Sequence, residues 1–182
     1  YAVLLANGAW RDRPLGLDGV DRFIDRGLAY QNPFVYWFNH SEDPTYEGPR
    51  YRVMDDAIVV GGGLASVDVI KILNLELYRA ALAERGIVVP MVELEHMGIP
   101  KTLATHKVDR GQLGIQGATL YYRRRVRDMP IAFPKDETAE QRAKTEGVRE
   151  KMVNILAQKY LVRVRDCHAA TGSGRSRNRA RA

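Results

Sequence analysis

The pattern most suggestive of chemistry is a run of three glycines with the spacing Gly-x-Gly-x-x-Ser; they are Gly61, Gly62 and Gly63. In a dinucleotide-binding turn the first glycine permits a tight bend and the second lets a pyrophosphate approach the backbone. A small third residue, here Ser66, lets the following helix pack closely on its strand. Backbone amides at the helix start would face the phosphates, at the positive end of the helix dipole; they belong to Leu64, Ala65 and Ser66. A plain tight turn is the alternative explanation of the three glycines.

Arginines form the second group of candidate residues, directly after an apolar segment that ends at Tyr122; they are Arg123, Arg124, Arg125 and Arg127. The planar guanidinium makes paired, charge-assisted hydrogen bonds to phosphate. In a dinucleotide fold the tip of the second strand lies beside the adenosine ribose, where an acid selects NAD and an arginine suits the 2′-phosphate of NADP. A solvated basic loop explains the arginines equally well by themselves, but after a glycine turn they favour NADP.

A strand, a turn and a helix must position the glycines. Residues 56–60 form a short apolar run rich in β-branched side chains, which predicts a strand covered on both faces of a parallel sheet. Residues 64–83 contain no proline or glycine, and apolar side chains recur there at spacings of three and four, which predicts a helix. These side chains are Val67, Ile70, Leu73, Leu77 and Ala81. Arg85 and Gly86 supply a stop signal, so the order is the one a dinucleotide-binding unit requires.

The segment after this helix allows two interpretations. Residues 87–92 could be the second strand, but Pro90 would remove a hydrogen-bond donor from its middle. We prefer a short helix over 91–97, with Pro90 in its first turn and Gly98 just past its end. The alternative strand would carry an acid at its tip and move the preference to NAD; the candidate acids are Glu93 and Glu95.

The remaining elements complete an α/β pattern. We expect a strand over 117–122, a helix over 137–159 and a further strand over 160–164. The aromatic stretch 34–38 predicts either a packed helix or an extended packing segment. The fold class expected is a Rossmann-like parallel sheet with helices on both faces, an inserted helical segment, and an N-terminal flank from a neighbouring FAD domain.

Composition limits the other possibilities. The chain has 182 residues, 45% of them hydrophobic and 27% charged, so it can bury one core. No apolar stretch approaches the roughly 18 residues that a membrane span needs. The net charge is +6, but four arginines lie in a low-complexity tail and leave 6 − 4 = +2, which is weak evidence for a nucleic-acid partner; they are Arg175, Arg177, Arg179 and Arg181.

The cysteine, the histidines and the first residues add three expectations. Cys167 is the only cysteine, so it forms no internal disulfide and fits a reducing, cytoplasmic location. The histidines have no metal-ligand spacing, so we expect no metal site; they are His40, His96, His106 and His168. Tyr1–Leu5 reads as a buried strand without an initiator methionine or a basic region, so we expect no signal peptide and a piece of a longer protein.

Two segments together resemble a known family. They are Asp56-Ala-Ile-Val-Val-Gly-Gly-Gly-Leu-Ala-Ser-Val-Asp68 and Tyr122-Arg-Arg-Arg-Val-Arg-Asp-Met-Pro130. Both are similar to segments of the small subunit of NADPH-dependent glutamate synthase and of related pyridine-nucleotide-disulfide-type flavoproteins. Leu5–Trp10 looks like the Ala-Thr-Gly-Ala-Trp segment of that family, with Asn7 in place of its threonine. The matching segments lie within residues 1–134.

The resemblance implies an NADPH-binding domain of an FAD-dependent oxidoreductase, which presents the nicotinamide to flavin for hydride transfer. Gly61, Gly63 and Ser66 would form the pyrophosphate turn, and Arg123 and Arg124 would contact the 2′-phosphate. The cofactor carries the chemistry, so we assign no catalytic acid or base. The partners implied are the FAD domain of the same polypeptide and an iron–sulfur or glutamate-synthase-type subunit, with no membrane and no nucleic acid.

The same resemblance implies a domain division and an alternative function. We expect a flank and crossover from an FAD-type domain over 1–52, an NAD(P)-binding domain over 53–166 with an insertion at about 77–113, and a disordered basic tail over 167–182. Gly61 and Arg123 lie 62 positions apart, against roughly 20 between the usual fingerprint and its ribose selector. The chain lacks flavin-binding segments, so FAD belongs to the full-length protein; a non-catalytic regulatory or electron-transfer adaptor domain is the alternative.

Overall fold

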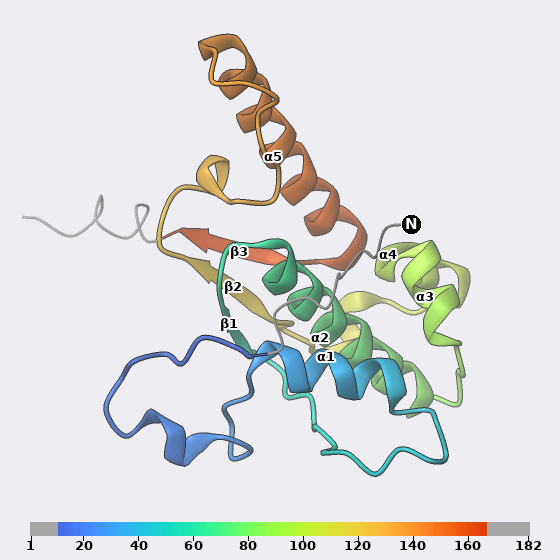
Figure 1. Ribbon diagram of the computed structural model, residues 1–182. Coiled ribbons are helices and arrows are strands. Elements are labelled where there is room, and N and C mark those ends of the chain that lie inside the picture. The colour runs from blue at the N-terminus through green and yellow to red at the C-terminus, as the bar shows by residue number, and fades with distance from the viewer. Residues whose placement is uncertain (1–10, 167–182) are drawn as a thin grey trace, which may run out of the picture. The chain divides into compact units, whose positions relative to one another are not determined.

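The computed structural model describes residues 11–166 and divides the chain into two compact units, one ending at Arg52 and the other beginning at Val53 (Figure 1). The expectations for the N-terminal strand, for the crossover, for Cys167 and for the arginine tail lie outside the described residues. Each unit is considered by itself below.

The first unit contains one α-helix, α1 (Gln31–His40), and a short 3-10 turn, η1 (Val20–Phe23), within its described residues. The helical alternative for the aromatic stretch is therefore the right one. Phe34 and Trp37 are buried on one side of α1, with ring centroids 5.4 Å apart, and each ring lies 5.7 Å from that of Tyr51. Aromatic pairs at such distances add to the free energy gained from burial alone, so this cluster is the core of the unit.

The second unit is built on a three-stranded parallel sheet of β1 (Ile58–Val60), β2 (Thr119–Tyr122) and β3 (Arg163–Asp166). The strand order is β1-β2-β3, with neighbours hydrogen-bonded. Parallel neighbours need crossover connections, and here helices supply them. The α/β class and the parallel sheet predicted from the sequence are confirmed, and the arrangement is compatible with a Rossmann-like fold.

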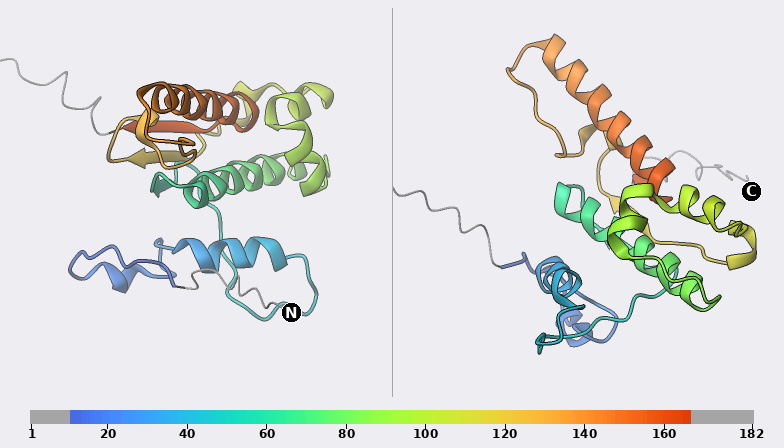
Figure 2. Two further views of the ribbon diagram at one scale, coloured as in Figure 1. Left: turned by 45° about the horizontal axis from the view of Figure 1, so that its top comes forward. Right: turned by 90° about the vertical axis from the view of Figure 1, so that its right-hand side faces the viewer.

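Four α-helices accompany the sheet in the described part of this unit, and Figure 2 shows them from two further sides. They are α2 (Leu64–Ala83), α3 (Met91–Met97), α4 (Ile99–Thr105) and α5 (Ala139–Tyr160), with 3-10 turns η2 (Arg110–Leu113) and η3 (Val126–Asp128). The helix predicted over 64–83 is confirmed at both ends. Pro90 and Gly98 flank α3 as predicted, so the strand alternative over 87–92 is wrong.

Helix α2 packs on β1 and β2, and α5 packs against α2 and α4. Val59 and Leu120 are buried on the covered face of the sheet, while α2 contributes Ile70, Leu75 and Tyr78 to the core. Leu77 and Ala81, which the spacing placed on the buried face of this helix, are only half-buried. Helices α3 and α5 contact α2 in addition to the sheet, so its buried side is set by several elements and does not coincide with the stripe that the spacing predicted.

The exposed face of β1 shows that the expectation of a strand covered on both faces is wrong. Ile58 is 67% exposed and Val60 is 71% exposed, so β1 is not covered on both faces within the described residues. Side chains alternate along a strand, and only Val59 between them is buried. The β-branched run indicated a parallel strand correctly but did not show what covers each face. We therefore find helical cover on one face of this strand, not on both.

A buried asparagine ties three elements of the second unit together. Asn74, in the middle of α2, is fully buried. Its Nδ2 donates to the Tyr160 carbonyl oxygen at 2.9 Å, and its Oδ1 accepts from the Ala118 amide at 2.8 Å. Buried polar groups need such partners, because an unpaired one costs free energy. Asn74 therefore links α2 to the end of α5 and to the start of β2.

The expected insertion contains α3, α4 and η2, and α3 is linked to two other helices. The Lys71 Nζ of α2 lies 2.9 Å from Glu95 Oε1, and the Tyr160 hydroxyl of α5 donates to the Glu95 carbonyl oxygen at 3.0 Å. Burial alone would lower the pKa of Lys71, but the carboxylates of Glu95 and Asp68 raise it above its ordinary value. Among the described residues, no helix has the length and apolar composition needed to cross a membrane.

Candidate functional site

The glycine turn and the arginine segment leave the sheet at the same edge. Val60 pairs with Tyr121 in the parallel register, so β1 and β2 reach their carboxyl ends together. The Gly61 amide continues the pairing and donates to the Tyr121 carbonyl oxygen at 3.1 Å. Glycines that follow β1 and arginines that follow β2 are thus neighbours, although they are 62 positions apart in the sequence. Ligands of open α/β sheets bind at this edge.

Steric contacts explain the first two glycines of the turn. A Cβ atom on Gly61 would lie 2.7 Å from the Cβ of Ser66, and one on Gly62 would lie 2.2 Å from Cε2 of Tyr122. Both distances are shorter than real Cβ contacts, so neither position has room for a side chain. The small residue at position 66 and the ring of Tyr122 therefore pack directly on the bare backbone of the turn.

Gly63 differs from its two neighbours because the space beside it is open. It is the N-cap of α2, with φ −87°, and nothing lies within 4 Å of the position a Cβ would take. Leu64 and Ala65 follow it and are exposed. The first amides of a helix have no helical carbonyl to bind, so these two are available to an acceptor from outside. This is the backbone geometry that a phosphate needs at a helix start.

The Ser66 amide, which the sequence placed among those facing the phosphates, is already bound within the turn. Its amide donates to the Gly63 carbonyl oxygen at 3.1 Å, and its hydroxyl donates to the same oxygen at 2.7 Å. The serine therefore closes the turn from inside while its Cβ packs on Gly61. Of the three amides named from the sequence, those of Leu64 and Ala65 remain open.

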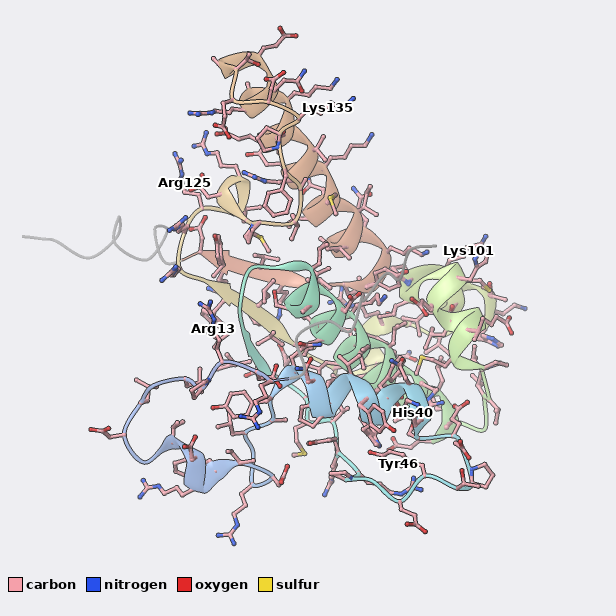
Figure 3. The ribbon with its side chains drawn as sticks, in the orientation of Figure 1. Arg13, His40, Tyr46, Lys101, Arg125 and Lys135 are labelled. Carbon is pink, nitrogen blue, oxygen red and sulfur yellow. The ribbon has the colours of Figure 1, made fainter. Side chains whose placement is uncertain are left out.

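The four arginines after β2 fall into two kinds. Arg125 binds Asp128 with two hydrogen bonds, of 2.9 and 3.1 Å, and the guanidinium of Arg127 lies 4.0 Å from Glu146. Arg123 and Arg124 are exposed and form no ion pair or hydrogen bond within residues 11–166. The side chain of Arg125 lies near the start of η3 in Figure 3. Two guanidinium groups are therefore free to bind an anion at this edge.

Two residues that the sequence did not single out hold the arginine segment. The Tyr122 ring covers Gly62, and its hydroxyl donates to the Asp128 carbonyl oxygen at 3.1 Å. Arg149 of α5 donates to the carbonyl oxygens of Arg127 and Ala132. An aromatic residue at a strand end was the available signal for Tyr122. No sequence signal pointed to Arg149, because its acceptors are backbone oxygens.

Asp68, in α2, takes part in an ion pair within its own helix. Its carboxylate is 56% exposed and lies 3.4 Å from Lys71 Nζ, three residues along the same helix. Among the described residues, no three His, Cys, Asp or Glu side chains gather as a metal ion would need.

The residues at this edge fit the nucleotide that the sequence implied. An anion at the α2 N-terminus would meet the open side of Gly63 and two available amides, as a pyrophosphate requires. A second anion one strand further along the edge would meet Arg123 and Arg124, as a ribose 2′-phosphate requires. No acid stands at the tip of β2, because the segment there reads Tyr-Arg-Arg-Arg.

Comparisons with known proteins give one relative. NADPH:adrenodoxin oxidoreductase, mitochondrial, from Arabidopsis thaliana is 26% identical to this chain over an alignment of 168 residues that covers 87% of this chain and 33% of the relative. This chain thus spans about a third of the length of that protein. No family model matches the chain, and no solved structure matches it. The similarity supports the broad family of pyridine-nucleotide oxidoreductases, and the finer likeness to the glutamate synthase small subunit stays a prediction.

Proposed function

We propose that the second unit binds NADPH at the carboxyl edge of its sheet and, in the full-length protein, presents the nicotinamide to FAD for hydride transfer. One observation carries the proposal: an open glycine turn and two unpaired arginines, among the described residues, follow neighbouring strands that are in register. The relative is an oxidoreductase named for NADPH, which agrees with this site.

The two halves of the site would bind different parts of the nucleotide. The amides of Leu64 and Ala65 would donate to the pyrophosphate, which lies against Gly63 at the positive end of the α2 dipole. Arg123 and Arg124 would bind the 2′-phosphate, which NADH lacks. The hydride chemistry belongs to the nicotinamide and the flavin, so the protein contributes binding and orientation.

The flavin and the partner proteins follow from the resemblance and not from the site. We propose an FAD domain in the same polypeptide, in agreement with the share of the relative that this chain spans. The relative is named for adrenodoxin as well as NADPH. For this protein we keep the acceptor expected from the sequence, an iron–sulfur or glutamate-synthase-type subunit.

Titration of the 182-residue chain with NADPH and with NADH tests the proposal. We expect NADPH to bind more tightly, and the double substitution Arg123→Ala with Arg124→Ala to erase the difference, at roughly 1–3 kcal/mol per charged contact. The affinity for NADH should change little, because NADH has no 2′-phosphate for these arginines to bind. Calorimetry or the fluorescence of the reduced nicotinamide gives both dissociation constants.

Lys101→Ala is the matched control, because it removes one exposed positive charge from α4, and Figure 3 shows this lysine away from Arg125. It should leave both affinities unchanged. Equal affinities for NADPH and NADH in the unaltered chain would refute the arginine assignment, and failure to bind either nucleotide would refute the site.

A further inference from the structure

One arginine of α5 holds the backbone of the segment that follows Arg123 and Arg124. Arg149 Nη1 donates to the Arg127 carbonyl oxygen at 2.9 Å. Its Nε and Nη2 donate to the Ala132 carbonyl oxygen at 3.0 and 2.7 Å. The two acceptors precede Arg149 by 22 and 17 residues, so the contact joins α5 to the loop after β2, which runs beside this helix in Figure 1.

Arg149 has no carboxylate partner among residues 11–166, so its donors go to backbone oxygens. A guanidinium has five N–H groups in a rigid plane and can bind two carbonyls at a fixed separation. A lysine ammonium carries the same charge without that plane, so it cannot hold both carbonyls in the same way.

Tyr122 makes a second contact with the same segment. The Tyr122 ring packs on Gly62, and its hydroxyl binds the Asp128 carbonyl oxygen. Within the segment, the Asp128 amide donates to the Arg125 carbonyl oxygen at 2.8 Å, and the side chains of these two residues are paired. The backbone from Tyr122 to Ala132 is thus fixed at both ends, and the two arginines without a partner in the described chain lie at its start.

We propose that Arg149 is a positioning residue that sets the preference of the nucleotide site for NADPH over NADH. This inference rests on the proposed function. Binding groups that the protein holds in place lose less conformational entropy when the ligand arrives, which strengthens binding. Without these hydrogen bonds, which we call the Arg149 clamp, Arg123 and Arg124 would keep their charges but lose their fixed distance from the glycine turn. The affinity for NADPH would then fall, because only NADPH carries the 2′-phosphate that these arginines bind.

Arg149→Lys tests the inference because it keeps the charge and removes the fork. We expect the affinity of the full chain for NADPH to fall about tenfold, the effect of losing roughly one hydrogen bond to a charged group. NADH affinity should stay within about twofold, since the glycine turn is untouched, so the NADPH-to-NADH ratio falls about tenfold. Retained NADH binding also shows that the variant is folded.

Lys151→Ala is the matched control, because Lys151 is an exposed cation on the same helix that makes none of these contacts. It should leave the ratio unchanged. Tyr122→Phe is the second variant: it keeps the ring on Gly62 and removes the hydroxyl that binds Asp128, and we expect a smaller fall in the same ratio, about threefold.

The results of these measurements distinguish a failure of the inference from a failure of the proposed function. Failure of the unaltered chain to bind either nucleotide would remove the proposed function itself, and equal affinities for the two would refute the arginine assignment on which the inference rests. A normal preference in the unaltered chain and in Arg149→Lys would overturn the positioning part alone. Equal losses for NADPH and NADH in a folded Arg149→Lys would also overturn it, because the contact would then support the whole site and not the arginine half alone. If Arg149→Lys fails to fold, an unchanged ratio in Tyr122→Phe decides against the inference, and a lowered ratio supports it.

Discussion

The glycine turn and the arginine segment stand side by side, yet they are held in place by different means. The turn is shaped by missing side chains: Ser66 and Tyr122 approach Gly61 and Gly62 more closely than any Cβ would allow. The arginine segment is shaped by hydrogen bonds, which Arg125 donates to Asp128 within it and which Arg149 donates to its backbone from α5. The contact between Gly61 and Ser66 joins residues close in sequence, whereas the hydrogen bonds of Arg149 join α5 to a segment 17 to 22 residues earlier. The two halves should therefore respond differently to substitution.

The largest effect is expected where the two regions touch. In Gly62→Val the new Cβ would lie 2.2 Å from the Tyr122 ring, which β2 and the Asp128 bond keep in place. Overpacking of this kind costs about 3 kcal/mol, and more where the backbone cannot move. We expect the free energy of unfolding, measured with urea, to fall by at least about this amount. A loss below about 1 kcal/mol would show that the ring is free to leave the turn.

Gly63→Val sharpens the comparison one residue further on. Nothing lies within 4 Å of the new Cβ, and the φ of −87° suits any residue, so the free energy of unfolding should change by less than about 1 kcal/mol. The added side chain would occupy the space where the pyrophosphate approaches the backbone. We expect both nucleotides to bind about 30-fold more weakly, or ~2 kcal/mol, with the far-ultraviolet circular dichroism unchanged.

Unaltered nucleotide affinity in Gly63→Val would remove Gly63 from the site. Ala80→Gly is a suitable control, because position 80 is exposed on the same helix and lies outside the site. Its effect should be confined to stability, at about 1 kcal/mol or less.

The glycines, Ser66 and the start of α2 could be predicted from the sequence because they lie in one short segment, whereas the Tyr122 ring that packs on Gly62 comes from another strand. Helix α2 begins and ends where the absence of proline and glycine indicated, and Pro90 and Gly98 marked α3. The sequence shows the arginines as a cluster, but it does not show which of them are paired with carboxylates. Arg125 is paired because Asp128 lies one turn of 3-10 helix away, whereas Arg123 and Arg124 have no such acid among the described residues.

The rest depended on contacts between distant segments. Arg149 binds backbone oxygens, and any residue type presents those, so no pattern in the sequence indicates the clamp. The role of Asn74 could not be predicted either, because polar residues of a helix usually face water and the partners of this one are backbone groups of distant segments. The exposed side chains of Ile58 and Val60 show the opposite error: apolar composition predicts a strand, but burial of each face depends on the elements that cover it.

The smallest effect should come from the ion pair inside the arginine segment. The Arg125 guanidinium holds the pKa of Asp128 below its ordinary value of 3.8, although burial acts in the opposite direction. A carboxyl group with a lowered pKa stabilises the folded state above its unfolded pKa, and this contribution disappears as the pH falls through the folded value. Arg125 is half exposed, so solvent screening keeps this contribution small.

Asp128→Asn isolates that contribution from those of the other carboxyl groups. At pH 7 the variant should unfold at a slightly lower urea concentration than the unaltered chain, and the gap should close as the pH falls below about 4. A gap that stays constant with pH would mean that the loss comes from packing and not from charge. The carboxamide introduced by this substitution still accepts one hydrogen bond from Arg125, and Tyr122 binds a backbone oxygen that the substitution leaves in place. The clamp through Arg149 therefore survives in this variant, and the NADPH-to-NADH ratio should shift less than it does in Arg149→Lys.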